Sequence, residues 1–243
     1  MSGSFTFAGT SSADYNASIE KVPALNRPAR KQTIIEIPGR SGSIVFPEDA
    51  WSNVAQTYDI FFSARNPAQA ARALIEWLQG VKGYQRLTDT FDPDVYRMAY
   101  VDGSMSIENL QNAVLRTQVT FSCRPERYLL TGEQDVTIEE SGGRIYNNTA
   151  FDAKPLLRVN GTGSGTLSVI NGAKTYTVSI SAISSYIMLD CEDQDAYKSG
   201  TNLNNNVTIT SGSSFPHLGS ANNEIIWTGG ITSVRITPRW YEI

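Results

Sequence analysis

One helical segment, residues 66–80, constrains the fold of this chain most. Asn66 suits the N-cap, because its side-chain oxygen can accept a hydrogen bond from a free backbone N–H, and Pro67 suits the first helical position. Gly80 is expected to adopt the left-handed conformation just past the helix end. Apolar residues recur on one face at helical spacing: Ala70, Leu74, Trp77, Leu78 and Val81. Strand patterns dominate elsewhere, so this single amphipathic helix must cover the apolar face of a sheet.

Short alternating segments predict the strands of the first half. We expect strands at 5–7, 33–37, 43–46, 56–64 and 113–124, and a pair at 84–87 and 92–100. Between the second and third of these, Gly39 and Gly42 are available for positive φ, so 33–46 is a candidate extended β-hairpin. Pro23 and Pro28 make 22–30 an extended connection rather than a central strand.

The composition changes near Thr131, and we place a domain boundary there, dividing 1–135 from 136–243. Strands are expected at 155–160, 165–171, 174–180, 186–191, 206–210, 225–229 and 231–238. Asn171-Gly172 predicts a type I′ hairpin turn. The glycine-rich segment 161–165 predicts a hairpin loop, since a phosphate loop would need a following lysine and helix start. The fold class is therefore mainly β, with two β-sandwich domains, the first carrying the helix and the hairpin.

Composition narrows the classes of partner. The 243 residues are 40% hydrophobic and 18% charged, with a net charge of −4, which disfavours a broad grip on a phosphate backbone. One basic concentration, Arg27, Arg30, Lys31 and Arg40, is either solvated surface or a contact with nucleic acid or an acidic partner. The chain opens without a signal-peptide pattern and has no apolar run of about 20 residues, so we expect a soluble product that folds in a cytoplasm.

Candidate catalytic residues are few and scattered. His217 lies in a Phe-Pro-His-Leu-Gly segment typical of a packed turn, without a neighbouring nucleophile or further ligands. The acidic run 190–195 could bind a cation or a sugar, but it lacks EF-hand spacing, and a solvated strand end is the better interpretation. Asp89, Asp92 and Asp94 match turn chemistry better than a glycosidase carboxylate pair. We expect no enzymatic activity, no cofactor and no bound metal.

Two further residue types have competing interpretations. Cys123 and Cys191 are expected to be reduced, half-buried thiols, because two cysteines do not make a disulfide scaffold in a chain of this size. Four aromatic residues outside the helix, Trp51, Trp227, Trp240 and Tyr241, are assigned to core or inter-domain packing, with a sugar- or protein-binding surface as the alternative.

Several short motifs follow one another in a characteristic order along the whole chain. The first half carries them at 5–15, 37–42, 77–78, 84–89 and 92–96, and the second half at 151, 155, 170–172, 215–216 and 238–240. In order and spacing they resemble the distal tail protein (Dit) family of long-tailed bacteriophages that infect Gram-positive bacteria. Ala8 departs from the pattern, since Asn is usual in the family at this position.

The resemblance implies an assembly protein of the virion tail tip. Six copies would form a ring between the tail tube and the tail hub or tail-associated lysin. The second domain would be a galectin-like or carbohydrate-module-like sandwich that faces outward, towards a receptor-binding protein or cell-wall glycan. In some relatives the last strand, here 231–243, returns to the first domain. The protein would be made and assembled in the host cytoplasm, and genomic DNA would pass through the ring without specific binding.

The resemblance, together with the residue pattern, suggests two candidate contact surfaces. Pairing the hairpin with a neighbouring copy would cover sheet edges that otherwise aggregate. The candidate oligomer interface consists of Ile35, Ile37, Gly39, Arg40, Ile44 and Phe46. The candidate outward contact surface consists of Asp190, Glu192, Asp193 and Trp227. The alternative function is a carbohydrate-binding adhesin; a cell-wall hydrolase is disfavoured, because the sequence shows no nucleophile with its base and orienting residue.

Overall fold

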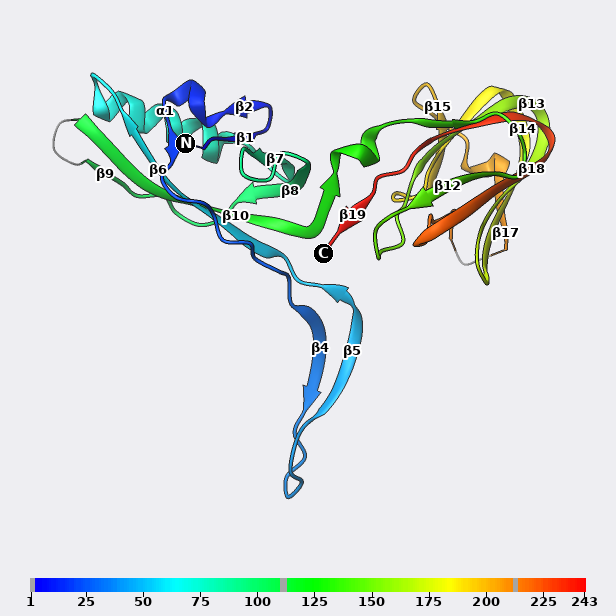
Figure 1. Ribbon diagram of the computed structural model, residues 1–243, viewed down its shortest axis with the longest axis horizontal. Helices are drawn as coiled ribbons and strands as arrows, with labels where there is room; N and C mark the ends of the chain where they lie inside the picture. Colours follow the sequence, from blue (N-terminus) through cyan, green and yellow to red (C-terminus); the bar gives the residue numbers. More distant parts are fainter. Residues whose placement is uncertain (1–2, 110–112, 212–213) are drawn as a thin grey trace. The chain divides into compact units, whose positions relative to one another are not determined.

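The computed structural model describes residues 3–109, 113–211 and 214–243, and their contacts divide into two compact units (Figure 1). Unit 1 extends to Arg127 and includes Ile243, whereas unit 2 comprises Tyr128–Glu242. Each unit has its own cluster of buried apolar side chains. Strands predominate in both units, which confirms the mainly β fold class.

Unit 1 contains one α-helix among its described residues, together with short and medium strands. Its elements are β1 (Phe5–Phe7), β2 (Thr10–Ser11), η1 (Ser12–Tyr15), β3 (Ser18–Ile19), β4 (Arg30–Ile35), β5 (Ile44–Trp51), β6 (Val54–Ser63), α1 (Pro67–Gly80), β7 (Gln85–Asp89), β8 (Val95–Val101), β9 (Ile107–Asn109) and β10 (Val114–Leu129). The main sheet runs in the order β2-β1-β7-β8-β10-β6-β3, and β9 also pairs with β10. Most neighbouring pairs are antiparallel, and β10 and β6 are joined from Val114 opposite Ser63 to Cys123 opposite Val54.

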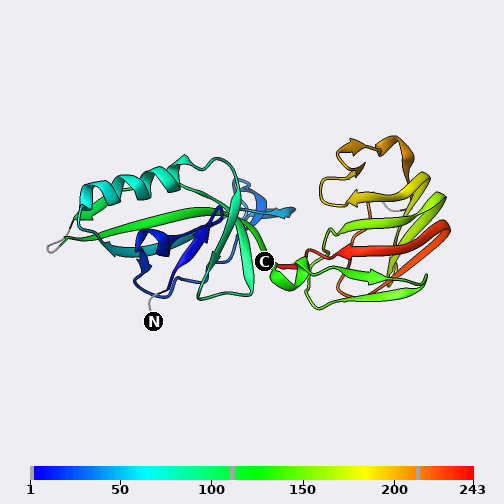
Figure 2. The same ribbon diagram turned by 90° about the horizontal axis from the view of Figure 1, so that it is seen from above.

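Helix α1 lies along one face of this sheet (Figure 2). The Asn66 side chain accepts a hydrogen bond from the Gln69 amide at 3.3 Å, and Pro67 begins the helix, as predicted. Leu74 and Leu78 are fully buried in the cluster that includes residues of β6 and β10. The predicted apolar face of the helix is therefore the face that covers the sheet.

The predicted helix end is wrong in detail. Gly80 is the last helical residue and does not have positive φ, and Val81 after it is already extended. The left-handed residue of this connection is Gly83, at φ 70°. The chain thus leaves the helix directly into extended backbone, without the left-handed cap that glycine often supplies.

Unit 2 is built from strands and short 3-10 turns. Its elements are η3 (Leu130–Glu133), β11 (Val136–Ile138), β12 (Gly143–Asn147), β13 (Leu156–Asn171), β14 (Lys174–Asp190), β15 (Asp195–Lys198), β16 (Thr201–Asn202), η4 (Asn204–Asn206), β17 (Val207–Ser211), β18 (Ala221–Thr237) and β19 (Tyr241–Glu242). The sheet order is β11-β18-β13-β14-β15-β16, with β12 also paired to β18 and β17 to β14. The last residues of β10 belong to unit 2, where β19 pairs with β10 and the Leu129 amide donates to the Trp240 carbonyl at 2.9 Å.

The three longest strands of unit 2 were each predicted as two strands, and this prediction is wrong. Strands β13, β14 and β18 continue through the predicted breaks, and their pairing register shifts near the middle, between Gly161 and Gly165. The glycine-rich segment 161–165 is therefore a bend within β13, not a hairpin loop. Val159 and Leu167, on the two sides of this bend, belong to the same buried cluster. Both halves of one strand thus cover a single core.

Glycine makes this bend sterically accessible. A Cβ atom on Gly161 would lie 2.2 Å from the carbonyl oxygen of Gly230, and one on Gly229 would lie 2.4 Å from that of Ser164. Neither approach is compatible with a side chain, so β13 and β18 can meet this closely only because glycines face each other across the pair.

Two smaller expectations for unit 2 also need correction. The β13–β14 hairpin exists, but Asn171 pairs with Lys174, so Gly172 and Ala173 are the central turn residues, and of these only Gly172 has positive φ. The alternative in which 231–243 return as a strand to the first domain does not describe 231–237. These residues belong to β18, which pairs with β11 and β13 of unit 2.

Candidate functional site

Strands β4 and β5 form a separate two-stranded ribbon, which we call the arm, residues 30–51. It pairs with no other strand of the described chain, and Figure 1 shows it leaving the sheet of unit 1. Every residue of β4 is exposed. An isolated two-stranded ribbon is at best marginally stable in water, so the arm is a structure that gains from a partner surface.

Apolar side chains occupy both faces of the arm. Residue pairing places Ile35 opposite Ile44 on one face and Ile34 opposite Val45 on the other. Ile34 is 54% exposed and Phe46 is 52% exposed. A ribbon that is apolar on both faces and uncovered on both faces is typical of a protein–protein contact element.

The tip of the arm is a tight turn. Pro38 and Gly39 are its central residues, Gly39 has φ 82°, and the Arg40 amide donates to the Ile37 carbonyl at 3.1 Å. Proline followed by a glycine of positive φ is the pattern of a type II turn. The fold thus gathers all six candidate interface residues on the arm, with only Ile44 among them half-buried.

At the base of the arm, the Arg30 guanidinium lies over the Trp51 ring, 4.8 Å from its centroid. Trp51 therefore packs on the arm rather than in either core. Arg27 donates to the carbonyl oxygen of Ile243. Of the four basic residues noted in the sequence, Arg27 and Arg30 thus make local contacts, whereas Lys31 and Arg40 are exposed.

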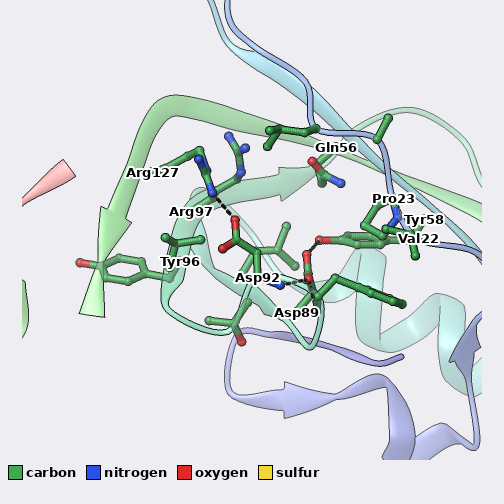
Figure 3. Close-up of a pocket in the computed structure, with 15 residues that line it drawn as sticks. Val22, Pro23, Gln56, Tyr58, Asp89, Asp92, Tyr96, Arg97 and Arg127 are labelled. Carbon is green, nitrogen blue, oxygen red and sulfur yellow. Dashed lines mark hydrogen bonds and ion pairs between the residues drawn. The ribbon is translucent and has the colours of Figure 1, made fainter. Parts of the chain in front are cut away.

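Unit 1 also contains a cavity of about 380 Å³ beside β7 and β8 (Figure 3). On one side, the Tyr58 hydroxyl donates to Asp89 at 2.7 Å, and the amides of Phe91 and Asp92 donate to the other Asp89 oxygen at 2.8 and 3.0 Å. Burial, together with the neighbouring Asp89 charge, raises the pKa of Tyr58 far above its ordinary value. Asp89 therefore orders the β7–β8 turn, and Asp92 is bound by the Arg127 guanidinium, so these carboxylates hold structure together.

Arg97 is the unexpected residue of this cavity. It occupies an inward position of β8, between the buried residues Val95 and Ala99, and is 7% exposed. Its Nη1 atom is buried without a hydrogen-bond partner in the described part of the chain. Burial lowers the pKa of the guanidinium, and the charge of Arg127 lowers it further. Sequence reasoning missed this site, although the alternation of Val95, Arg97 and Ala99 placed an arginine on the inward face.

In unit 2, the acidic run is anchored by an ion pair. The Arg239 guanidinium donates to both Asp190 oxygens, at 2.7 and 2.8 Å, and the amides of Glu192 and Asp193 donate to Asp190 as well. Burial alone would raise the pKa of the Asp190 carboxyl, but the Arg239 hydrogen bonds and charge lower it below its usual value. Asp190 is 7% exposed, so it does not belong to an outward surface.

The other three residues of the candidate outward surface differ in how far they are exposed to solvent. Trp227 packs, partly buried, against the unit 2 core, and Glu192 is half-buried near Arg239, whereas Asp193 is exposed. Of these four residues, Asp190 is buried, Glu192 and Trp227 are partly buried, and Asp193 is exposed. Trp240 is also buried in the unit 2 core.

The remaining candidates, His217 and the two cysteines, pack against other parts of the fold. The His217 ring packs 5.1 Å from the Tyr176 ring, centroid to centroid, and burial lowers its pKa. Cys123 and Cys191 are free and fully buried rather than half-buried. Within the described ranges, no group of acidic, histidine and cysteine residues could hold a metal ion, and none of the described helices is long and apolar enough to cross a bilayer.

The described chain combines a helix-covered sheet, a two-stranded arm that pairs with no other strand, and a unit of strands and short 3-10 turns. The crystal structure of the SPP1 Dit (gp 19.1) protein matches this chain with a TM-score of 0.75 and 14% sequence identity, covering 100% of both chains. That protein is described as a paradigm of the hub adsorption apparatus in phages that infect Gram-positive bacteria. The likeness confirms that the chain has the Dit fold, as the sequence motifs indicated.

No protein-family model matches the sequence, and the search of curated proteins gives no match either. At 14% identity, the structural likeness establishes the fold and leaves the function to be argued from this chain's own surfaces.

Proposed function

We propose that this chain is a structural protein of a phage tail tip, and that six copies assemble through their arms into a ring. The observation that carries this proposal is the arm, with apolar side chains on both faces and no covering element among the described residues. The Dit fold over the whole chain supports the same role, since SPP1 Dit is associated by its description with a hub adsorption apparatus.

A ring accounts for the arm physically. Copies of one chain close into a ring when a head-to-tail contact is repeated with the right rotation. An arm that lies against the next copy buries Ile34, Ile35 and Phe46 there, and its unpaired strand edges can add to a neighbouring sheet. The same contact removes an exposed apolar edge that would otherwise cause aggregation.

The ring would join the tail tube on one side to the tail hub or tail-associated lysin on the other. Genomic DNA would pass through without specific binding, which fits the net charge of −4. Unit 2, a candidate galectin-like module, would face receptor-binding proteins or cell-wall glycan. The protein would be assembled in the host cytoplasm and would end at the virion tail tip.

The proposed role is structural rather than catalytic. The acidic groups that the sequence offered for catalysis serve as anchors: Asp89 holds a turn, Asp92 binds Arg127 and Asp190 binds Arg239. An adhesin that acts without assembly is the weaker alternative, because two residues expected on its contact surface are withdrawn from solvent: Asp190 is buried, and Trp227 is partly buried against the unit 2 core.

Sedimentation velocity over a range of protein concentrations tests the role of the arm. The wild-type chain should associate towards a hexamer, whereas the double variant Ile35→Ser/Phe46→Ser should remain monomeric with unchanged circular dichroism. Ile209→Ser is the matched control, since Ile209 is an exposed apolar residue of β17, 39% exposed, outside the arm. A wild-type chain that stays monomeric at every concentration, or a control that dissociates like the arm variant, would contradict the proposal.

A further inference from the structure

The cavity of unit 1 has an apolar rim and a polar wall to which Arg97, Arg127, Gln56, Asp89 and Asp92 contribute (Figure 3). Arg97 and Gln56, 7% and 6% exposed, both lie on inward positions of strands that flank β10 in the sheet order. The apolar rim comes from the extended connection after β3, where Val22 and Leu25 are 69% and 62% exposed. The cavity therefore joins a buried polar floor to an open mouth.

Two carboxylates and two guanidinium groups line this cavity, but neither carboxylate is paired with Arg97. The Arg127 guanidinium binds Asp92, and both Asp89 oxygens are occupied by Tyr58 and by backbone amides. No ion pair of Arg97 occurs within the described ranges, and its Nη1 atom has no acceptor there. A buried guanidinium without an acceptor is costly, so it gains from an anion that enters the cavity.

The shape of the donor set selects the kind of anion. A guanidinium presents parallel N–H groups that match the two oxygens of a carboxylate, and the Gln56 amide can add a third donor. The apolar rim suits the carbon atoms that carry the carboxylate. We propose that this cavity is a binding site for a carboxylate group, held by Arg97 with Gln56 beside it.

This site goes beyond the proposed assembly role, because it concerns a ligand group and lies apart from the arm residues. Two sources could supply the carboxylate: a free small organic acid, or an acidic side chain from a second copy of the chain. Either source presents the same carboxylate group to Arg97. Only a side chain from a second copy would make occupation of the cavity depend on self-association.

The first experiment uses trifluoroacetate as the probe and follows its ¹⁹F NMR line width with the full-length protein. The wild-type chain should broaden the line, acetate should compete, and chloride at equal ionic strength should not. Arg97→Met should weaken binding at least tenfold. The matched control Arg144→Met should bind like the wild type, because Arg144 lies on β12 of unit 2 with its side chain 66% exposed.

Equal broadening by the wild type and Arg97→Met would overturn the proposal, and so would no broadening by the wild type. If circular dichroism shows that Arg97→Met does not fold, Gln56→Leu provides the test, since it removes a donor with little change in volume. A loss of binding of threefold or more in Gln56→Leu supports the site, and unchanged binding overturns it.

Sedimentation velocity then distinguishes the two sources. If the carboxylate belongs to a second copy, acetate should shift the chain towards monomers and Arg97→Met should associate less than Arg144→Met. If the ligand is a free organic acid, trifluoroacetate should bind while association stays the same in all three proteins. The NMR experiment measures carboxylate binding and sedimentation velocity measures self-association. A failure of ring assembly is therefore distinguished from a failure of carboxylate binding.

Discussion

A Cβ atom on Gly230 would lie 1.7 Å from the carbonyl oxygen of Thr162, so β13 and β18 meet at a distance that only glycine permits. This contact lies at the bend that lets both halves of the long strands cover one core in unit 2. The fold of that unit therefore depends on a glycine that no local pattern marks as a turn.

Gly230→Ala should destabilise the protein by roughly 3 kcal/mol, because backbone atoms, not a flexible side chain, occupy the space that the methyl group needs. Urea unfolding followed by circular dichroism measures the change. Gly80→Ala is the control: Gly80 ends α1, has open space around its Cβ position, and should gain about 0.5 kcal/mol in stability. Equal effects of the two substitutions would contradict the account of the bend.

Asp190→Asn should cost about 3 kcal/mol in the free energy of unfolding, since it leaves the Arg239 guanidinium without its charge partner in a largely buried site. Asp152→Asn provides the matched comparison, because the Lys174–Asp152 pair is exposed and should contribute less than about 1 kcal/mol. Chemical denaturation of both variants at neutral pH gives the two values. A loss at Asp152 as large as that at Asp190 would argue against a special role for the buried pair.

The same ion pair predicts a pH dependence. The pKa of Asp190 is lower in the folded chain than its ordinary value of 3.8, because Arg239 outweighs the effect of burial. Such a carboxylate stabilises the fold fully above its unfolded pKa, and this stabilisation is lost as the pH falls through the folded pKa. Between about pH 5 and pH 2, the wild type should lose more unfolding free energy than Asp190→Asn. Parallel stability curves for the two proteins would show that this carboxyl is not responsible.

Neither cysteine should react with Ellman's reagent at mildly alkaline pH in the native protein. Burial raises the pKa of the Cys123 thiol to about 11 and that of Cys191 well above its ordinary value, so almost no thiolate is present, and both sulfur atoms lie in a core. Both thiols should react once the chain is unfolded in guanidinium. Rapid reaction of one thiol in the native protein would mean that its unit opens readily.

Gly39→Val should impair association without changing the stability of the monomer. Gly39 has φ 82° at the tip of the arm, where a β-branched residue is strained, and its surroundings are open, so the damage stays local to the turn. Sedimentation velocity and urea unfolding of the same preparation measure the two effects. If Gly39→Val lowers the unfolding free energy of the monomer as well as weakening association, the arm is part of the core fold.

Much of unit 1 could be predicted because its signals are local. Asn66 and Pro67 start a helix through contacts with residues a few positions away, and the 3.6-residue spacing identifies the face that covers the sheet. In β6 and β10, side-chain alternation alone separates the buried from the exposed face. The arm follows from Gly39 and Gly42 between two strand-like segments.

The sequence by itself thus determined the helix, the arm and the mainly β class, because each depends on spacing along a short stretch of chain. Only the tertiary structure decided that 161–165 bends within a strand, since Gly230 must lie opposite, and that Asp190 is buried, since Arg239 must reach it. The same holds for Arg97, whose Nη1 atom lacks a hydrogen-bond partner while Asp92 pairs with Arg127. Contacts between distant residues set these features, and no local pattern encodes which distant residue will arrive.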